Sequence, residues 1–327
     1  MSAIVADGTG GPAVLHVAHM PTPEPARGEV LIKVAAAGVN APDLAQRRGA
    51  YPPPPGASPL LGLEVSGEIV TPAGEWKAGD KVVALCNGGG YAEYVAVPAG
   101  QVLPVPEGWA LVEAAAVPET WFTITQTLLM RAGLASGMTL LVTGAAGGLG
   151  GAAIQIARIV GAYPIAIVSS DEKATYALAL GAHAIIRRDR EAVATRAREL
   201  TDGRGADRVL DMAGGSATGE LVGALARFGH LVIVATLSGG DGEIPLSRIV
   251  GSQLTISGST LRPQSPETKA DIARHLRRHI WPALADAAFP RPKIQRFPLG
   301  EAAAAHQMAE ASEHYGKIVL VTDFGNR

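Results

Sequence analysis

The sequence of 327 residues is long for one compact domain and favours two. Its composition, 47% hydrophobic and 18% charged, is typical of a globular enzyme, and a formal net charge of -2 provides no basic field for nucleic acid. No stretch reaches the roughly 20 apolar residues of a membrane span, and the first residues lack a signal-peptide pattern. The single cysteine, Cys86, excludes an internal disulfide and a multi-cysteine zinc site, and fits a cytoplasmic protein.

Residues 1–118 alternate short strand-like runs with turns rich in glycine and proline. Strands are expected at 30–35, 64–70, 81–85 and 91–97. The short spacing between these turns favours a compact, barrel-like β domain. The tail, 289–327, returns to strand-like patterning at 296–299 and 316–321, so we expect it to rejoin this first domain.

The character of the sequence changes near Glu113. A helix is expected over 113–130, and strands then alternate with helices in the pattern of a doubly wound α/β domain, which we place at 119–288. A further helix is expected at 266–284, with apolar residues on one face. The six expected strands are 140–143, 164–168, 183–186, 208–211, 230–234 and 254–259.

A glycine-rich turn follows the first of these strands and leads into an alanine-rich helix. The strand, turn and helix predict the phosphate-binding corner of a dinucleotide-binding unit. Gly147 allows the backbone to approach a pyrophosphate, and Gly150 allows the helix to lie close to the strand. Ala145 stands where the first glycine of the usual motif would be. The alternative is an ordinary glycine-rich turn, but the surrounding pattern favours a cofactor.

Hydroxyl and basic side chains follow the second and third strands. Ser169, Ser170 and Lys173 suit a phosphate monoester better than a ribose hydroxyl, and Arg187 and Arg188 add two cations. These residues favour NADPH over NADH, although Asp171 and Glu172 would repel a phosphate. The alternative is that Ser170 only caps a helix and the charges face solvent.

Two other motifs have simpler interpretations. The run 52–55 of four prolines resembles a ligand for a partner module, but a stiff loop beside a site is favoured because no disordered segment surrounds it. His275 and His279 have a metal-ligand spacing. Arginines lie between them and no carboxylate or cysteine accompanies them, so a solvated basic face is favoured.

Several segments together resemble one known family. They are AAAGVNAPDLAQRRGAYPPPPGASPLLGLEVSGEI at 35–69, WKAGDKVVAL at 76–85, GGGYAEYVAVP at 88–98 and GKIVL at 316–320. They resemble the zinc-free quinone oxidoreductases of the medium-chain dehydrogenases/reductases, most closely the tumour-suppressor-inducible branch and more distantly the zeta-crystallins. The resemblance implies a GroES-like domain, a Rossmann domain and a cleft that holds NADPH.

The same resemblance argues against a catalytic metal. Zinc-dependent relatives have a cysteine where this chain has Asn40 and a histidine where it has Leu63. Leu63 has no lone pair to donate, and an amide is a poor zinc ligand. The four-cysteine structural lobe is also absent. A Lewis-acid mechanism is therefore not expected.

Without a metal, hydrogen bonds must polarise the substrate, which favours electron-poor acceptors such as quinones and enones. Tyr51 and Asn40 are the expected catalytic donors, because a tyrosine hydroxyl or an amide can stabilise the oxyanion that hydride transfer creates. The alternatives are that Tyr51 packs against the prolines of its loop and that Asn40 is a turn former. Asp43 is expected to support this loop by accepting backbone N–H groups.

The resemblance also implies which residues bind the cofactor. Thr120 is expected at the nicotinamide ribose, the glycine loop at the pyrophosphate, and Lys317 at the phosphates. Two later segments are expected beside the adenosine and the nicotinamide. The full expected set is Thr120, Ala145, Gly147, Gly148, Leu149, Gly150, Ser170, Lys173, Arg188, Ala235, Thr236, Leu237, Ser259, Thr260, Leu261 and Lys317.

The favoured function is therefore NADPH-dependent reduction of quinones or related conjugated carbonyls. A 2-enoyl thioester reductase would share the cofactor and the electronic requirement, and a crystallin-like protein would bind NADPH without catalysis. The sixth strand, 254–259, is expected at a sheet edge that a second copy could extend, which predicts a homodimer.

Overall fold

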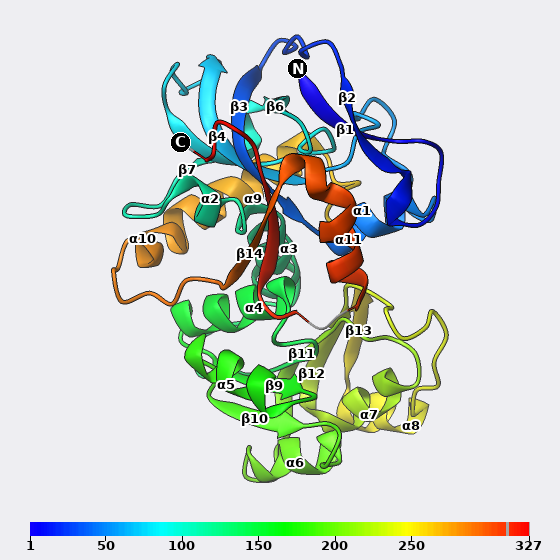
Figure 1. Ribbon diagram of the computed structural model, residues 1–327. Coiled ribbons are helices and arrows are strands. Elements are labelled where there is room, and N and C mark those ends of the chain that lie inside the picture. The colour runs from blue at the N-terminus through cyan, green and yellow to red at the C-terminus, as the bar shows by residue number, and fades with distance from the viewer. Residues whose placement is uncertain (312–313, 327) are drawn as a thin grey trace. The chain divides into compact units, whose positions relative to one another are not determined.

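The computed structural model describes residues 1–311 and 314–326, and the chain divides into two compact units (Figure 1). One unit combines residues 1–122 with 262–327, and the continuous stretch 123–261 forms the other. The second unit is therefore inserted into the first. No helix within the described residues is long and apolar enough to cross a membrane.

The first unit contains a seven-stranded, mostly antiparallel sheet in the order β14-β15-β3-β4-β5-β7, with β6 also paired to β3. A separate two-stranded sheet pairs β1 with β2. The tail strand β15 is antiparallel to β3 and parallel to β14. The strands are β1 (Ser2–Ala6), β2 (Leu15–His19), β3 (Glu29–Val39), β4 (Glu64–Thr71), β5 (Lys81–Leu85), β6 (Tyr94–Pro98), β7 (Val102–Pro104), β14 (Ile294–Pro298) and β15 (Lys317–Val321).

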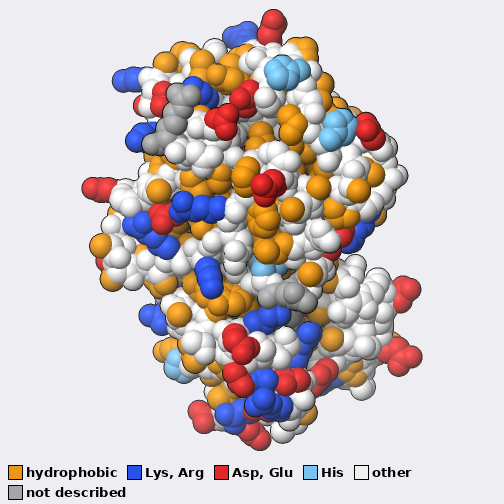
Figure 2. All heavy atoms as spheres, viewed as in Figure 1, with side chains coloured by type: hydrophobic (Ala, Val, Ile, Leu, Met, Phe, Trp, Pro, Cys, Tyr) orange, Lys and Arg blue, Asp and Glu red, His pale blue; other side chains and the backbone are white. Residues whose placement is uncertain are grey.

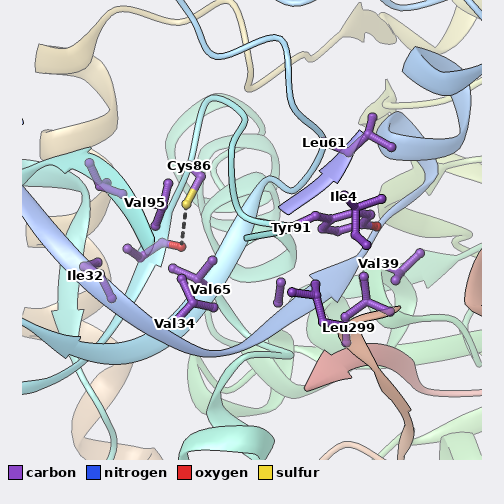
Figure 3. Packing of buried hydrophobic residues seen from close by; sticks show 14 of the residues in the cluster. Ile4, Ile32, Val34, Val39, Leu61, Val65, Cys86, Tyr91, Val95 and Leu299 are labelled. Atoms are coloured by element: carbon purple, nitrogen blue, oxygen red, sulfur yellow. Dashed lines mark hydrogen bonds between the residues drawn. The ribbon is translucent and has the colours of Figure 1, made fainter. Parts of the chain in front are cut away.

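The core of the first unit fills with aliphatic side chains that alternate along the strands. Ile32 and Val34 of β3 face the same interior as Val65 and Val95 (Figure 3). Cys86 also lies in this interior, where its thiol donates to the carbonyl of Ala84 at 3.9 Å. Burial raises the pKa of the Cys86 thiol, so this cysteine behaves as a small apolar residue.

The helices of the first unit surround this sheet. α9 begins at Ser265, whose hydroxyl accepts the N–H of Thr268 at 3.2 Å, and it ends in basic residues that complement the helix dipole. A second helix follows at once because Pro282 cannot continue the first. The helices are α1 (Ala41–Arg47), α2 (Leu111–Ala114), α3 (Pro118–Ile124), α9 (Pro266–His279), α10 (Trp281–Leu284) and α11 (Ala302–Ala311).

The domain boundaries and one helix differ from expectation. Residues 262–288 group with the first unit because α9 contacts β7 and the short helix η2 (Ala99–Gln101). The helix expected over 113–130 is interrupted: Pro118 starts α3, and a π-helical segment, η3 (Thr125–Arg131), follows. Apolar periodicity does not reveal such changes in backbone hydrogen bonding.

The second unit is a six-stranded parallel sheet in the order β10-β9-β8-β11-β12-β13, which confirms the doubly wound α/β domain. Helices α4 to α8 pack on the strands that they connect (Figure 1). The strands are β8 (Thr139–Val142), β9 (Tyr163–Val168), β10 (Ala184–Arg187), β11 (Ala206–Asp211), β12 (Leu225–Ile233) and β13 (Thr255–Gly258). The helices are α4 (Gly148–Ile159), α5 (Asp171–Ala179), α6 (Val193–Glu199), α7 (Ala217–Ala224) and α8 (Leu246–Ser252).

Candidate active site

The glycine turn after β8 leads directly into α4, with Gly147 as the residue before the helix. A Cβ on Gly150 would lie 2.4 Å from the carbonyl oxygen of Gly144, so only glycine permits this close approach of helix and turn. A Cβ on Gly147 would come no nearer than 3.4 Å to that oxygen, so the missing side chain there leaves space for a ligand. No side chain caps α4, and its first N–H groups can receive an anion.

The residues expected at a 2′-phosphate follow two neighbouring strands. Ser170 caps α5, where its hydroxyl accepts the N–H of Lys173 at 3.2 Å. Arg188 follows β10, and its N–H donates to the carbonyl of Val168 in β9 at 3.1 Å. The parallel pairing of β9 with β10 therefore places these residues at the same sheet edge.

The carboxylate of Asp171, which would oppose a phosphate, is paired with the guanidinium groups of Arg187 and Arg190. Figure 2 shows acidic and basic side chains intermingled on the surface around α6. The two arginines offset the negative charge that Asp171 brings to this edge.

The remaining cofactor candidates of the second unit also follow carboxyl ends of parallel strands. Ala235, Thr236 and Leu237 come after β12, and Leu237 is 73% exposed. Ser259 follows β13; its hydroxyl accepts a bond from Thr127 at 2.9 Å. The sheet thus brings together every candidate between Ala145 and Leu261 at one edge, where doubly wound folds bind ligands.

In the first unit, Asn40 and Lys317 meet around a buried carboxylate. The Asn40 amide nitrogen donates to Glu64 Oε1 at 2.9 Å, and its amide oxygen accepts from Lys317 Nζ at 2.6 Å. Lys317 also forms an ion pair with Glu64, and both side chains are at most 4% exposed. These contacts occupy the Lys317 ammonium within the protein, so the expected phosphate contact of Lys317 stays a prediction.

Asp43 fixes the loop that carries Asn40. One carboxylate oxygen accepts the backbone N–H of Asn40 and the other that of Gly62, each at 2.9 Å. Burial raises the pKa of Asp43 to about 6, while these two N–H bonds oppose the rise. Asp43 therefore has the supporting geometry expected of it.

Buried hydrogen bonds link Arg47, His306 and Tyr91 beside Asp43. Arg47 Nη1 lies 3.2 Å from His306 Nδ1, and His306 Nε2 lies 3.0 Å from the Tyr91 hydroxyl. An arginine can only donate, so Nδ1 accepts and the imidazole proton must be on Nε2. Tyr91 then accepts from His306, and burial together with the nearby Asp43 carboxylate raises the pKa of Tyr91. Burial lowers the pKa of His306 to about 4, so the ring is neutral near pH 7.

Tyr51 lies in the loop after α1, with the guanidinium carbon of Arg262 5.5 Å from its ring centroid. Among the described residues, no protein group hydrogen-bonds to the Tyr51 hydroxyl. Burial and Glu119 raise its pKa, and Arg262 opposes the rise. The phenol therefore keeps its proton near neutral pH and can donate it.

Thr120 lies in α3 and is buried. Its hydroxyl donates to the carbonyl of Val117 at 3.1 Å, as is common within helices. Toward a ligand this oxygen can therefore only accept, and the expected ribose contact of Thr120 remains a prediction.

The sequence analysis missed three charged residues of this network: Glu64, Glu119 and Arg262. Glu64 carried a usable signal, since it stands between the apolar residues Leu63 and Val65 at the start of an expected strand, and a carboxylate that is buried there requires a buried cation. Glu119 has a pKa raised to about 8, first by burial and then by Glu64 and Asp43. Nothing in the local sequence indicated Arg262.

Within the described residues, no three His, Cys, Asp or Glu side chains gather in a way that could hold a metal ion. His275 and His279 lie side by side, with ring centroids 4.7 Å apart, at the end of α9. The four-proline run lies in the loop that begins at Tyr51.

Comparisons with known proteins match both units. The family described as "Alcohol dehydrogenase GroES-like domain" matches residues 26–107, and that described as "Zinc-binding dehydrogenase" matches residues 148–277. A quinone oxidoreductase of Pseudomonas aeruginosa is 34% identical over 327 residues, which cover 95% of this chain and 97% of the relative.

Two solved structures are similar over almost the whole chain. A mycobacterial protein complexed with NADPH is 30% identical, with a TM-score of 0.86, covering 98% of this chain and 100% of that one. The quinone oxidoreductase of Escherichia coli complexed with NADPH is 26% identical, with a TM-score of 0.83 and the same coverage.

The neutral state of His306 predicts a pH-dependent loss of stability. As the pH falls below the ordinary pKa of 6.5, His306 takes up a proton in the unfolded chain. In the folded chain it remains neutral until about pH 4. Acidification through this window therefore lowers the free energy of unfolding. Wild type should lose about 2 kcal/mol relative to His306→Gln between pH 7 and pH 5 in urea titrations.

Asp43, Arg47, Arg48 and Glu310 also face this network, but their contributions largely cancel in the comparison between the two proteins. His19→Gln, on the exposed face of β2, should follow wild type at both pH values. If the free energies of unfolding of wild type and His306→Gln differ by the same amount at pH 7 and at pH 5, a neutral buried imidazole is contradicted.

Proposed function

Since the chain belongs to the quinone oxidoreductases of the medium-chain dehydrogenase/reductase superfamily, we propose that it transfers hydride from NADPH to quinones or related conjugated carbonyls without a metal ion. The observation that carries the proposal is the group of side chains around Glu64. Zinc-dependent relatives bind metal where this chain has Asn40 and Leu63, and here a lysine ammonium contacts both Asn40 and Glu64.

The residues around Asn40 do not suit a catalytic zinc. Leu63 is 1% exposed and has no donor atom, and both polar atoms of the Asn40 amide already have partners. The positive charge of Lys317 would repel a metal cation at this position. Hydrogen-bond donors are then the groups left to polarise a substrate, which suits electron-poor carbonyls.

The glycine turn and the edge of the second sheet fit a phosphorylated dinucleotide. The first N–H groups of α4, at Gly148 and Leu149, would receive the pyrophosphate, and Ser170, Lys173 and Arg188 the 2′-phosphate. When bound, NADPH supplies a hydride. NADPH complexes of two similar proteins support this choice of cofactor.

Tyr51 is the donor that this chain offers to the substrate oxygen. Its hydroxyl is not bonded to a described protein group, whereas the Asn40 amide is held by Glu64 and Lys317. When the substrate carbon accepts hydride, the carbonyl electron pair moves to oxygen, and the Tyr51 O–H stabilises and then protonates that oxygen. Asn40 shapes this region and has at most one amide hydrogen left to offer.

Replacing Tyr51 by phenylalanine tests the proposed donor. With NADPH and 9,10-phenanthrenequinone, wild type should oxidise the cofactor, and Tyr51→Phe should lower kcat by about 100-fold because one oxyanion donor is lost. The loss of NADPH absorbance measures the turnover of wild type and of Tyr51→Phe. Tyr315→Phe, at an exposed lysine contact in the same unit, provides the control and should retain wild-type turnover.

Assays with a quinone, a simple enone and a 2-enoyl thioester distinguish quinone reduction from the two alternative functions. Turnover of a 2-enoyl thioester, but of no quinone or simple enone, would identify a thioester reductase. Tight NADPH binding without turnover of any of these acceptors would favour a binding protein of the crystallin type.

Cofactor preference depends on the proposed phosphate contacts. NADPH should bind more tightly than NADH, and Lys173→Ala should reduce the ratio of their dissociation constants roughly 10-fold to 100-fold, since a charge-assisted contact contributes about 1.5–3 kcal/mol. Fluorescence titration of both cofactors measures the ratio. Arg204→Ala, at another exposed basic residue of this unit, should leave it unchanged. If the ratio of the NADPH and NADH dissociation constants is the same in Lys173→Ala as in wild type, Lys173 does not contact the 2′-phosphate.

A homodimer through the second unit is supported by an exposed sheet edge and a neighbouring apolar helix face. Within the residues that the structure describes, β13 pairs only with β12, and Leu246 and Val250 of α8 are 68% and 79% exposed. These two residues are four apart, so they share one side of the helix. A second copy could extend the sheet at β13 and cover that side.

Substitution at α8 should separate the subunits. Wild type is expected to be dimeric by light scattering at micromolar concentration, and Val250→Asp to be monomeric, because a carboxylate would be buried in the interface. Leu178→Asp, at a 51% exposed leucine of α5, should remain dimeric. A monomeric wild type would refute the arrangement.

A further inference from the structure

We propose that Arg262 is a second, cationic donor to the substrate oxygen beside Tyr51, forming a site for the oxyanion of a reduced carbonyl. This inference rests on the proposed function, since it names the partner that Tyr51 has in the same reaction. It concerns a residue to which no expectation from the sequence gave a role.

The guanidinium of Arg262 is buried with one nitrogen left over. The residue is only 6% exposed, and Nε and Nη2 both donate to the carbonyl oxygen of Asn87, at 3.3 and 3.0 Å. Within the described residues, Nη1 is buried and has no hydrogen-bond partner. Buried donors of a charged group are normally paired, so this nitrogen requires an acceptor that the protein does not supply.

The position of Arg262 is fixed by Lys269 and Asn87. Lys269 Nζ donates to the backbone carbonyl of Arg262 at 2.8 Å and to the side-chain oxygen of Asn87 at 2.6 Å. Asn87 therefore accepts bonds from both cations, one at its backbone and one at its side chain. A guanidinium held in this way is preorganised, which is what an oxyanion site requires.

The charges nearby also favour an incoming anion. Arg262 and Lys269 are two buried cations, and burial lowers the pKa of Lys269 to about 8, with Arg262 contributing. The nearest acids do not neutralise them fully. Glu119, with a pKa of about 8, is largely protonated at pH 7, which leaves the Asp43 carboxylate, with a pKa of about 6, to balance two cations.

The site adjoins the proposed proton donor. The guanidinium carbon of Arg262 lies over the Tyr51 ring, 5.5 Å from its centroid, and this proximity is the basis for assigning both residues to one small carbonyl compound. Hydride uptake at carbon shifts the carbonyl electron pair to oxygen. Arg262 Nη1 stabilises that negative charge, and the Tyr51 hydroxyl transfers its proton to the same oxygen and is then reprotonated from water.

Kinetics of arginine variants provide the first test. With NADPH and 9,10-phenanthrenequinone, Arg262→Met should lower kcat by about 100-fold, with the NADPH KM little changed. The kcat of Arg262→Lys should lie between the kcat values of wild type and Arg262→Met, because lysine keeps the charge but lacks the second nitrogen. Arg278→Met, at an exposed arginine of α9, should match wild type. Unchanged turnover in Arg262→Met would overturn the proposal.

Binding of a phenolate tests the site without catalysis. In the presence of NADP+, 4-nitrophenol should bind as its anion, and the phenolate absorbance measures the bound fraction. Arg262→Met should weaken this binding at least 10-fold and favour the neutral phenol. Arginine-dependent phenolate binding without quinone turnover would support the site and refute quinone reduction. Equal phenolate affinity in wild type and Arg262→Met would refute the site, whatever the turnover.

Thermal unfolding shows whether Arg262→Met is folded. If it is not, Arg262→Lys decides, because a lysine ammonium bonded to the Asn87 carbonyl leaves no second nitrogen for the ligand. Clearly weaker phenolate binding in Arg262→Lys supports the site, and wild-type affinity overturns it.

Discussion

The buried ion pair between Lys317 and Glu64 is the interaction on which the first unit depends most. It joins the start of β15 to the start of β4, and through Asn40 it also holds the end of β3. Two buried charges are tolerated only when each has partners, and loss of one partner in such a pair typically destabilises a protein by about 3–5 kcal/mol. The pair therefore fixes three segments that are distant in sequence, at the point where the proposed chemistry differs from that of zinc enzymes.

A second buried network supports the same loop from the other side. Arg47 donates to His306 and His306 donates to Tyr91, beside Asp43, which holds the backbone of Asn40 and Gly62. Because an arginine can only donate, its contact with His306 Nδ1 fixes which imidazole nitrogen carries the proton. Helix α11, which carries His306, thus contributes to the geometry around Asn40 although it lies near the end of the chain.

Much of the fold could be predicted from the sequence because it depends on local patterns. Apolar runs and turn residues predicted the six strands of the second unit and most strands of the first, although not β1, β2 or β7, and the glycine spacing predicted the turn before α4. Pro118 is a local signal for a helix start, but the π-helical segment after Ile124 could not be predicted in the same way, since it depends on a change in backbone hydrogen bonding that residue types do not reveal.

The residues of the candidate site also fall into those that the sequence could predict and those that it could not. Residues that follow the carboxyl ends of parallel strands were predictable, because the topology alone gathers them at one edge. Lys317 was expected at the cofactor phosphates, but its ammonium lies on Glu64, and a partner so distant in sequence leaves no local pattern. Arg262 was missed for the same reason, since its contacts with Asn87 and Tyr51 exist only in the folded chain.

The pairing of β15 with β3 also constrains how the polypeptide acquires its structure during synthesis. β3 leaves the ribosome before the inserted unit is made, yet its neighbour β15 follows that unit, on the order of tens of seconds later. The inserted unit, being continuous in sequence, can fold in the interval. The nascent first unit meanwhile exposes an unpaired strand border, which makes it the stage at which chaperones would be most needed.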